Sequence, residues 1–197
     1  MYRIMLLTAC VTFFPLAVAD NIVDETCATV PADSIKAPAS PSIEVAFSPD
    51  GGGESLVLKT ISAAKSSIRL AAYSFTLPSV VRALTHAKQR GVDVAVLIDY
   101  KINLEGARNN APKQALKLLV SAGIPTRTIS TYFAHHDKYM VVDGCHTETG
   151  SFNYTTAAAK YNSENVMVIW NNPQVANQYI AHWQSRWQQS QDYHPSY

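Results

Sequence analysis

Residues 135–165 read HHDKYMVVDGCHTETGSFNYTTAAAKYNSEN, and the expected fold is organised around them. Residues 136–142 have the apolar character of a strand, and the dipeptide Asp143-Gly144 favours a tight hairpin turn. Residues 145–149 can then return beside the first strand. Gly150 and Ser151 predict a loop. The stretch therefore predicts a β-hairpin with a loop after its second strand.

Segments with the periods of strands and helices alternate along the rest of the chain. Apolar runs predict the strands, and apolar residues on one helical face predict the helices. The expected strands are 42–47, 67–74, 92–99, 124–128 and 165–170, and the expected helices are 54–65, 78–89, 112–121 and 173–189. The polar residues 100–110 are expected to form a loop. This alternation predicts an α/β fold with a mixed, largely parallel central β-sheet flanked by helices.

The first 19 residues have the pattern of a secretory signal peptide. Arg3 precedes an apolar stretch at 4–16, and Ala17-Val18-Ala19 forms an A-x-A cleavage site. We expect cleavage after Ala19 and a periplasmic or secreted protein. The apolar stretch is shorter than the ~20 residues of a membrane span, so no stable span is expected in the mature form. A retained anchor is the alternative.

Composition and charge limit what the mature chain can do. Residues 20–41 are polar and carry three prolines, which predicts a flexible arm, and residues 42–197 suit one globular domain. The net charge is +1, and removal of Arg3 with the leader leaves 15 basic against 15 acidic residues. Because bulk charge does not favour polyanions, any affinity for nucleic acid must come from a local patch.

Three cysteines are present, and Cys10 leaves with the leader. Cys27 and Cys145 could form a disulfide in an oxidising compartment, or remain two unpaired thiols. No Cys/His cluster has the spacing of a zinc site.

Residues 136–153 contain the pattern H-x-K-x4-D-x6-G-S-x-N, and a glutamate follows shortly after it. The set formed by the pattern and this glutamate consists of His136, Lys138, Asp143, Gly150, Ser151, Asn153 and Glu164. Side chains at i and i+2 of a strand share a face, so His136 and Lys138 are expected to point into one site. An imidazole can attack or protonate at neutral pH, and an ammonium can hold a phosphate oxygen.

The other members of the set have distinct expected roles. Asn153 offers amide donors and Ser151 a hydroxyl for the same phosphate. Glu164 can accept the second ring N–H of His136 and thereby fix its tautomer. Asp143 has the opposite strand parity, so together with Gly150 it is expected to support the hairpin and loop. The set therefore predicts a phosphodiester-cleaving site.

The same chain carries an internal control for this motif. His86, Lys88 and Asp93 also satisfy H-x-K-x4-D, but His86 and Lys88 lie on a predicted helix, where i and i+2 do not face each other. The short pattern is therefore weak, and the extended pattern carries the inference. The remaining histidines are expected to be structural or surface residues: His86, His135, His146, His182 and His194. Lys160 and Arg108 are expected to be solvated surface charges or part of a backbone-binding rim.

The extended motif resembles the HKD motif of the phospholipase D superfamily. Residues 72–76 (AYSFT), 90–94 (RGVDV) and 162–165 (NSEN) add to the resemblance, which runs from about residue 42 to the C-terminus. Within the superfamily the chain is similar to the small bacterial endonucleases that carry a single motif. The resemblance implies that residues 42–197 form a phospholipase D-like nuclease domain.

The resemblance also implies a mechanism. His136 would form a phosphohistidine intermediate that water hydrolyses, while Lys138, Ser151 and Asn153 bind the phosphate and Glu164 orients the histidine. The family uses two such histidines, so one motif per chain implies a homodimer with a shared site. No cofactor and no metal are implied.

Three functions remain open at this point. The first is a non-specific endonuclease that cleaves DNA, with RNA as a further substrate. The second is a phospholipase D that hydrolyses phosphatidyl head groups, which is disfavoured because the sequence shows no amphipathic or hydrophobic element to capture lipid. The third is a non-catalytic module that binds phosphate or nucleic acid, and its hallmark would be a missing His, Lys or Asn in the motif.

Overall fold

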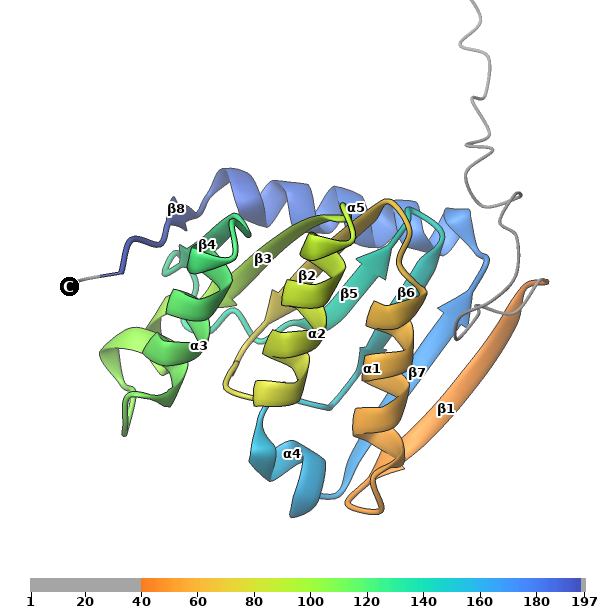
Figure 1. The fold of residues 1–197 in the computed structure, drawn as a ribbon, viewed down its shortest axis with the longest axis horizontal. Helices are drawn as coiled ribbons and strands as arrows, with labels where there is room; N and C mark the ends of the chain where they lie inside the picture. Colours follow the sequence, from red (N-terminus) through yellow and green to blue (C-terminus); the bar gives the residue numbers. More distant parts are fainter. Residues whose placement is uncertain (1–39, 196–197) are drawn as a thin grey trace, which may run out of the picture.

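The computed structural model describes residues 40–195, which form one eight-stranded sheet with helices on both faces (Figure 1). The strand order is β1-β7-β6-β5-β2-β3-β4-β8. The strands are β1 (Ser42–Ser48), β2 (Ser67–Ala72), β3 (Asp93–Asp99), β4 (Thr126–Ile129), β5 (Lys138–Val142), β6 (His146–Gly150), β7 (Glu164–Trp170) and β8 (Gln191–Asp192). The helices are α1 (Gly52–Ala63), α2 (Pro78–Gln89), the π-helix η2 (Lys101–Glu105), α3 (Ala111–Ser121), α4 (Thr156–Lys160) and α5 (Pro173–Gln188). In this part of the chain no helix is long and apolar enough to cross a membrane.

The predicted α/β class and the mixed sheet flanked by helices are confirmed. Parallel pairing is confined to β2, β3 and β4, which are joined through α2 and α3. The other pairings are antiparallel, so the sheet is less parallel than expected. The physical reason is the hairpin: once β5 pairs antiparallel to β2, its short turn makes β6 antiparallel as well.

Two local features differ from the sequence expectation. β5 begins at Lys138 and not at residue 136, because Lys138 pairs with Ala72, the last residue of β2. Residues 101–105 form a π-helix where a loop was expected. The short elements α4 and β8 were not predicted. The other strands and helices fall within a few residues of the expected ranges, and α2 matches its range at both ends.

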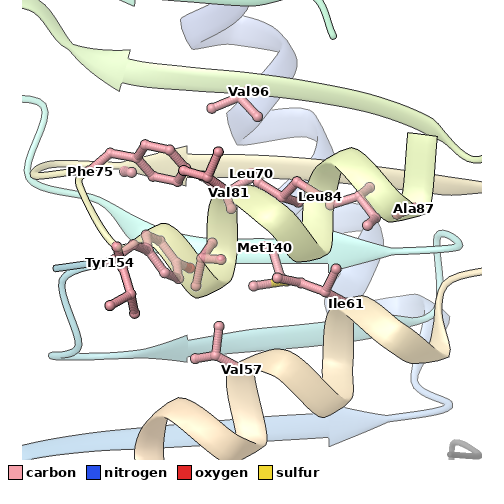
Figure 2. Packing of buried hydrophobic residues seen from close by; sticks show 14 of the residues in the cluster. Val57, Ile61, Leu70, Phe75, Val81, Leu84, Ala87, Val96, Met140 and Tyr154 are labelled. Carbon is pink, nitrogen blue, oxygen red and sulfur yellow. The ribbon is translucent and has the colours of Figure 1, made fainter. Parts of the chain in front are cut away.

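Two clusters of buried apolar side chains hold the helices to the sheet. The larger cluster lies between the sheet and α1, α2 and α3, and includes Ile61, Leu70, Leu84 and Met140 (Figure 2). The smaller cluster lies under α5 on the opposite face, where Trp183 packs. Apolar burial of this kind stabilises by roughly 25 cal/mol per Å². The sheet is therefore a rigid platform for side chains at its edges.

The hairpin turn is fixed by its own backbone conformation and by hydrogen bonds to a neighbouring segment. Asp143 and Gly144 have φ values of 53° and 66°, the positive values that a type I′ turn requires. The Asp143 carboxylate accepts N–H bonds from Lys65, Ser66 and Ser67 at 2.8–2.9 Å. Asp143 thus ties the hairpin to the segment before β2, which is the supporting role expected from its parity.

One part of the α5 face of the sheet is covered by none of the helices of residues 40–195. Ile43, Val45 and Phe47 of β1 are 66%, 52% and 61% exposed. They pair with Ile169, Met167 and Asn165 of β7, so these side chains share one face. We call Ile43, Val45, Phe47, Met167 and Ile169 the open apolar face. Contiguous exposed apolar side chains of this size commonly mark an interaction surface.

Glu148 on β6 is a carboxyl group inside the larger core. It is 1% exposed and accepts a hydrogen bond of 2.7 Å from the Tyr154 hydroxyl. Burial raises the pKa of Glu148 to about 8, against an opposing contribution from that hydrogen bond. The native state therefore keeps Glu148 protonated at neutral pH.

This burial predicts a pH-dependent stability. The folded pKa lies above the unfolded value near 4.5, so between about pH 4.5 and 8 unfolding releases a proton. The contribution of Glu148 to the free energy of unfolding should fall by about 1.4 kcal/mol per pH unit in this window. Glu148→Gln should abolish that slope, whereas Glu105→Gln on the surface should retain it. Urea denaturation at several pH values measures both; an unchanged slope in Glu148→Gln would contradict the assignment.

Candidate active site

His136 and Lys138 meet at the edge of the sheet where β5 begins. The Lys138 ammonium donates to the His136 carbonyl oxygen at 2.9 Å and lies 3.3 Å from both ring nitrogens. The ammonium is therefore equally close to both ring nitrogens. The two side chains are therefore brought together, as strand parity predicted, although His136 precedes the strand.

Lys138 is mostly buried, and its charge is only partly compensated. Burial lowers the pKa of Lys138, while the nearby carboxylates of Glu164 and Asp137 oppose that shift. Neither carboxylate forms a hydrogen bond with the Lys138 ammonium within residues 40–195. An anionic phosphate oxygen at this position would restore the missing partner.

Glu164 lies at the start of β7 and is held by neighbours other than His136. Its carboxylate accepts hydrogen bonds from the Ser151 hydroxyl at 2.5 Å and from the Asn162 amide at 2.9 Å. In the described chain no hydrogen bond joins Glu164 to His136, so the expected contact is not formed here. Ser151 in turn accepts the Asn165 N–H at 3.1 Å, so it orients Glu164 through its hydroxyl.

Asn153 and Gly150 shape the loop opposite His136. The Asn153 side-chain oxygen is buried and has no hydrogen-bond partner among the described residues. An unsatisfied buried amide oxygen is costly, and only a ligand that supplies a hydrogen-bond donor would satisfy it. The amide N–H groups of Asn153 are the donors that can bind a phosphate oxygen. At Gly150 an added Cβ would lie 2.2 Å from the Asn165 carbonyl oxygen. Glycine is thus required for the loop to pass directly against β7.

Tyr73, just after β2, is a site residue that sequence reasoning missed. Its ring centroid lies 4.5 Å from that of His136, and the Lys138 ammonium lies 5.2 Å from the Tyr73 ring. The ring therefore packs against both members of the pair. The only sequence signal was its place in residues 72–76, which contributed to the family resemblance without a role of their own.

Two buried polar residues hold Tyr73 and His136 in place. Asn103 of the π-helix donates to the Tyr73 carbonyl oxygen at 2.6 Å and accepts the Phe75 N–H at 3.0 Å. Asp99, at the end of β3, accepts the His135 N–H at 2.8 Å. π-helical turns occur frequently at functional sites. Here the π-helix places the Asn103 amide where it can bridge β3 and the segment after β2.

A pocket of about 440 Å³ opens beside His136 on the α5 side of the sheet. Tyr139, Tyr179 and His182 contribute to its wall. The His182 Nε2–H donates to the Asp137 carboxylate at 2.9 Å, and the same carboxylate oxygen lies 3.4 Å from Nδ1 of His135. His182 was expected to be a structural or surface residue, and this pair links α5 to the strand that carries Lys138.

Tyr73→Ala should lower kcat/KM by about 10- to 100-fold, because an ammonium–ring contact and the packing of His136 are both lost. Tyr73→Phe keeps the ring and should stay within about threefold of the wild type. Steady-state hydrolysis of a small chromogenic phosphodiester measures both variants. Equal activities for the alanine and phenylalanine variants would show that the ring has no part in the reaction.

A family model described as "Cardiolipin synthase, PLD-like domain" matches residues 57–187, and this range includes the whole site. The chain belongs to the phospholipase D family. It is accordingly a phosphodiesterase of that family, and the histidine–lysine pair is the part of the site that the family motif predicts.

Individual relatives of this phospholipase D family protein agree with the assignment. The crystal structure of Nuc, a phospholipase D family member from Salmonella typhimurium, is 47% identical with a TM-score of 0.74, covering 78% of this chain and 99% of that one. Phospholipase D of Rickettsia typhi is 32% identical over 74% of this chain and 68% of its own length. Mitochondrial cardiolipin hydrolase of Mus musculus is 35% identical over 58% of this chain and 49% of its own length.

Several expectations for this phospholipase D family protein fall outside residues 40–195. They are the signal peptide, most of the arm and Cys27. Cys145 is buried beside His146. Because Cys27 lies outside the described residues, a Cys27–Cys145 disulfide stays a prediction. Among the described residues no group of three or more His, Cys, Asp or Glu side chains is placed to hold a metal ion.

Proposed function

We propose that this protein is a metal-independent endonuclease that cleaves DNA, and RNA as a further substrate, through a phosphohistidine intermediate. The observation that carries the proposal is the exposed His136 ring with the Lys138 ammonium 3.3 Å from both of its nitrogens. Asn153, on the loop after β6, adds amide N–H donors for a phosphate oxygen. This arrangement pairs a nucleophile with donors for the phosphate it attacks.

The reaction follows from these groups. A neutral His136 nitrogen attacks phosphorus, an N–P bond forms, and the bond from phosphorus to the leaving oxygen breaks. A second imidazolium gives its proton to that oxygen. Water then attacks the phosphohistidine, the same second imidazole takes the water proton, and His136 is released. Lys138 and Asn153 compensate the negative charge on the phosphate oxygens throughout.

The second imidazole is proposed to be His136 of a second copy of the chain. Each chain carries one motif, and the open apolar face lies on the same side of the sheet as the pocket beside His136. Covering this face with another copy would remove Ile43, Val45 and Phe47 from water and bring a partner to the site. Homodimers are usually closed by a two-fold axis, which suits a site shared by two identical histidines.

Nucleic acid is favoured as substrate by the resemblance to single-motif bacterial endonucleases and by the 47% identity to Nuc. Hydrolysis of phosphatidyl head groups is the second candidate, and it is favoured by relatives that are named phospholipase D and cardiolipin hydrolase. The same histidine chemistry serves either phosphodiester.

The test uses purified mature protein on plasmid DNA, RNA and phosphatidylcholine vesicles, each with and without EDTA. Cleavage of DNA that persists in EDTA is the expected result. Activity lost in EDTA would overturn the metal-independent mechanism, and turnover of lipid without DNA would establish the second candidate. Export with cleavage after Ala19 is proposed as well, and N-terminal sequencing of the exported protein should begin at Asp20.

A further inference from the structure

A second polar groove lies between α1 and α2, on the face of the sheet opposite α5. Its volume is about 310 Å³, and Arg82, His86 and Arg90 of α2 line it together with Ser62 and Ser79. The three basic residues are spaced four apart, so they form one stripe along the helix. His86 is the histidine of the second, non-catalytic H-x-K pattern. We call this the α2 groove.

The α2 groove presents uncompensated positive charge. None of the described residues that line it is acidic. Arg82 is exposed and has no hydrogen bond or ion pair with another described side chain. Arg90 donates to the Ala64 carbonyl oxygen at 3.3 Å, which fixes its guanidinium at the end of α1. Glu54 of α1 accepts the Ser79 hydroxyl at 2.5 Å at one end of the groove. The stripe therefore offers free guanidinium donors on a rigid helix.

The groove starts at the edge of the sheet that carries the active site. α2 begins directly after the segment that follows β2 and contains Tyr73. The backbone N–H groups of Thr76 and Leu77 donate to Tyr154, which lies next to Asn153. From Ser79 to Arg90 the helix advances about 16 Å at 1.5 Å per residue. A chain bound at the active-site edge of the sheet could thus continue along α2.

We propose that the α2 groove binds phosphates of a polynucleotide beyond the one that is cleaved. The inference rests on the proposed endonuclease function and names where the substrate is held. The mature chain has no excess of basic residues, so affinity for a polyanion requires such a local stripe. Guanidinium groups bind phosphate oxygens with two parallel N–H bonds. An anionic membrane is disfavoured because no large exposed apolar side chain borders the stripe to anchor it.

The test measures binding of fluorescent single-stranded DNA to protein made catalytically inert by His136→Asn. Arg82→Gln is compared with Lys113→Gln, which removes the same charge from the exposed surface of α3. Arg82→Gln should weaken binding of a 20-nucleotide strand about three- to tenfold and reduce the slope of log Kd against log salt concentration by about 1. For a dinucleotide, which is too short to reach the groove, the Kd values of the two variants should be closer to each other.

Equal affinities of Arg82→Gln and Lys113→Gln for the long strand would overturn the inference. Weaker binding of Arg82→Gln to phosphatidylglycerol vesicles but not to DNA would also overturn it and assign the groove to lipid. Arg90→Gln provides a second variant. Its melting temperature shows whether weaker DNA binding comes from the lost guanidinium or from destabilisation of α1. Failure of the endonuclease proposal is recognised independently, because the wild type would then hydrolyse a small phosphodiester without cleaving DNA.

Discussion

Replacing His136 with asparagine should lower phosphodiester hydrolysis by at least about 10⁴-fold, the loss seen when a nucleophile is removed from a site that acts as a unit. Asparagine cannot form the N–P bond, while Lys138 and Asn153 still bind the phosphate. The His136 side chain is exposed, and the described residues that contact its ring are Tyr73 and Lys138. The free energy of unfolding should therefore change by less than about 0.5 kcal/mol.

The matched control is His194→Asn, which changes an exposed histidine beyond α5 and should leave activity unchanged. Steady-state rates on a chromogenic phosphodiester and thermal unfolding measure both variants. Mass spectrometry of acid-free quenched wild-type enzyme should show the phosphoryl adduct on a peptide containing His136. A His136→Asn variant that keeps more than about 1% of wild-type activity would rule out nucleophilic attack by this side chain.

The second large effect is expected at the open apolar face. If the proposed homodimer forms through this face, Val45→Glu should convert it to a monomer, because a carboxylate without a partner would be buried in the contact, at a cost of several kcal/mol. Activity should fall with the dimer fraction, since an isolated chain supplies one motif histidine, His136, where the proposed reaction needs two. Val45 is 52% exposed in the single chain, so the fold itself should tolerate glutamate.

Leu118→Glu is the matched control, because Leu118 is 58% exposed on α3, away from the open apolar face. Sedimentation velocity and hydrolysis rates over a range of protein concentrations test both variants. A Val45→Glu protein that sediments as a monomer with full activity would refute the shared site. A dimer that survives the substitution would place the contact on another surface.

Local patterns were sufficient for much of this fold. The helical period and the flanking Pro78 predicted α2 with both ends correct, because its buried stripe faces one continuous core. Asp143-Gly144 predicted the hairpin because positive φ values are confined to few residue types. The same short-range geometry placed His136 beside Lys138. These features depend on residues close together in the sequence.

Features that depend on distant contacts were not predictable. Asn103 reaches Tyr73, thirty residues away, and no local pattern marks that hydrogen bond. Glu164 was expected to accept a hydrogen bond from His136, but its carboxylate accepts hydrogen bonds from the Ser151 and Asn162 side chains. The alternation in residues 42–47 predicted a strand correctly. It could not show that the apolar side chains of that strand are the exposed ones.

The pairing of β1 with β7 also constrains how the protein is made. Ser42 lies opposite Trp170, and Ser48 lies opposite Glu164. The first strand to leave the ribosome therefore has no edge to join until nearly the whole chain has been synthesised. Such distant pairings fold slowly and leave apolar strands exposed in the meantime. Until β7 has been synthesised, β1 of the nascent chain remains unpaired. In this unfolded state a chaperone could still bind the chain.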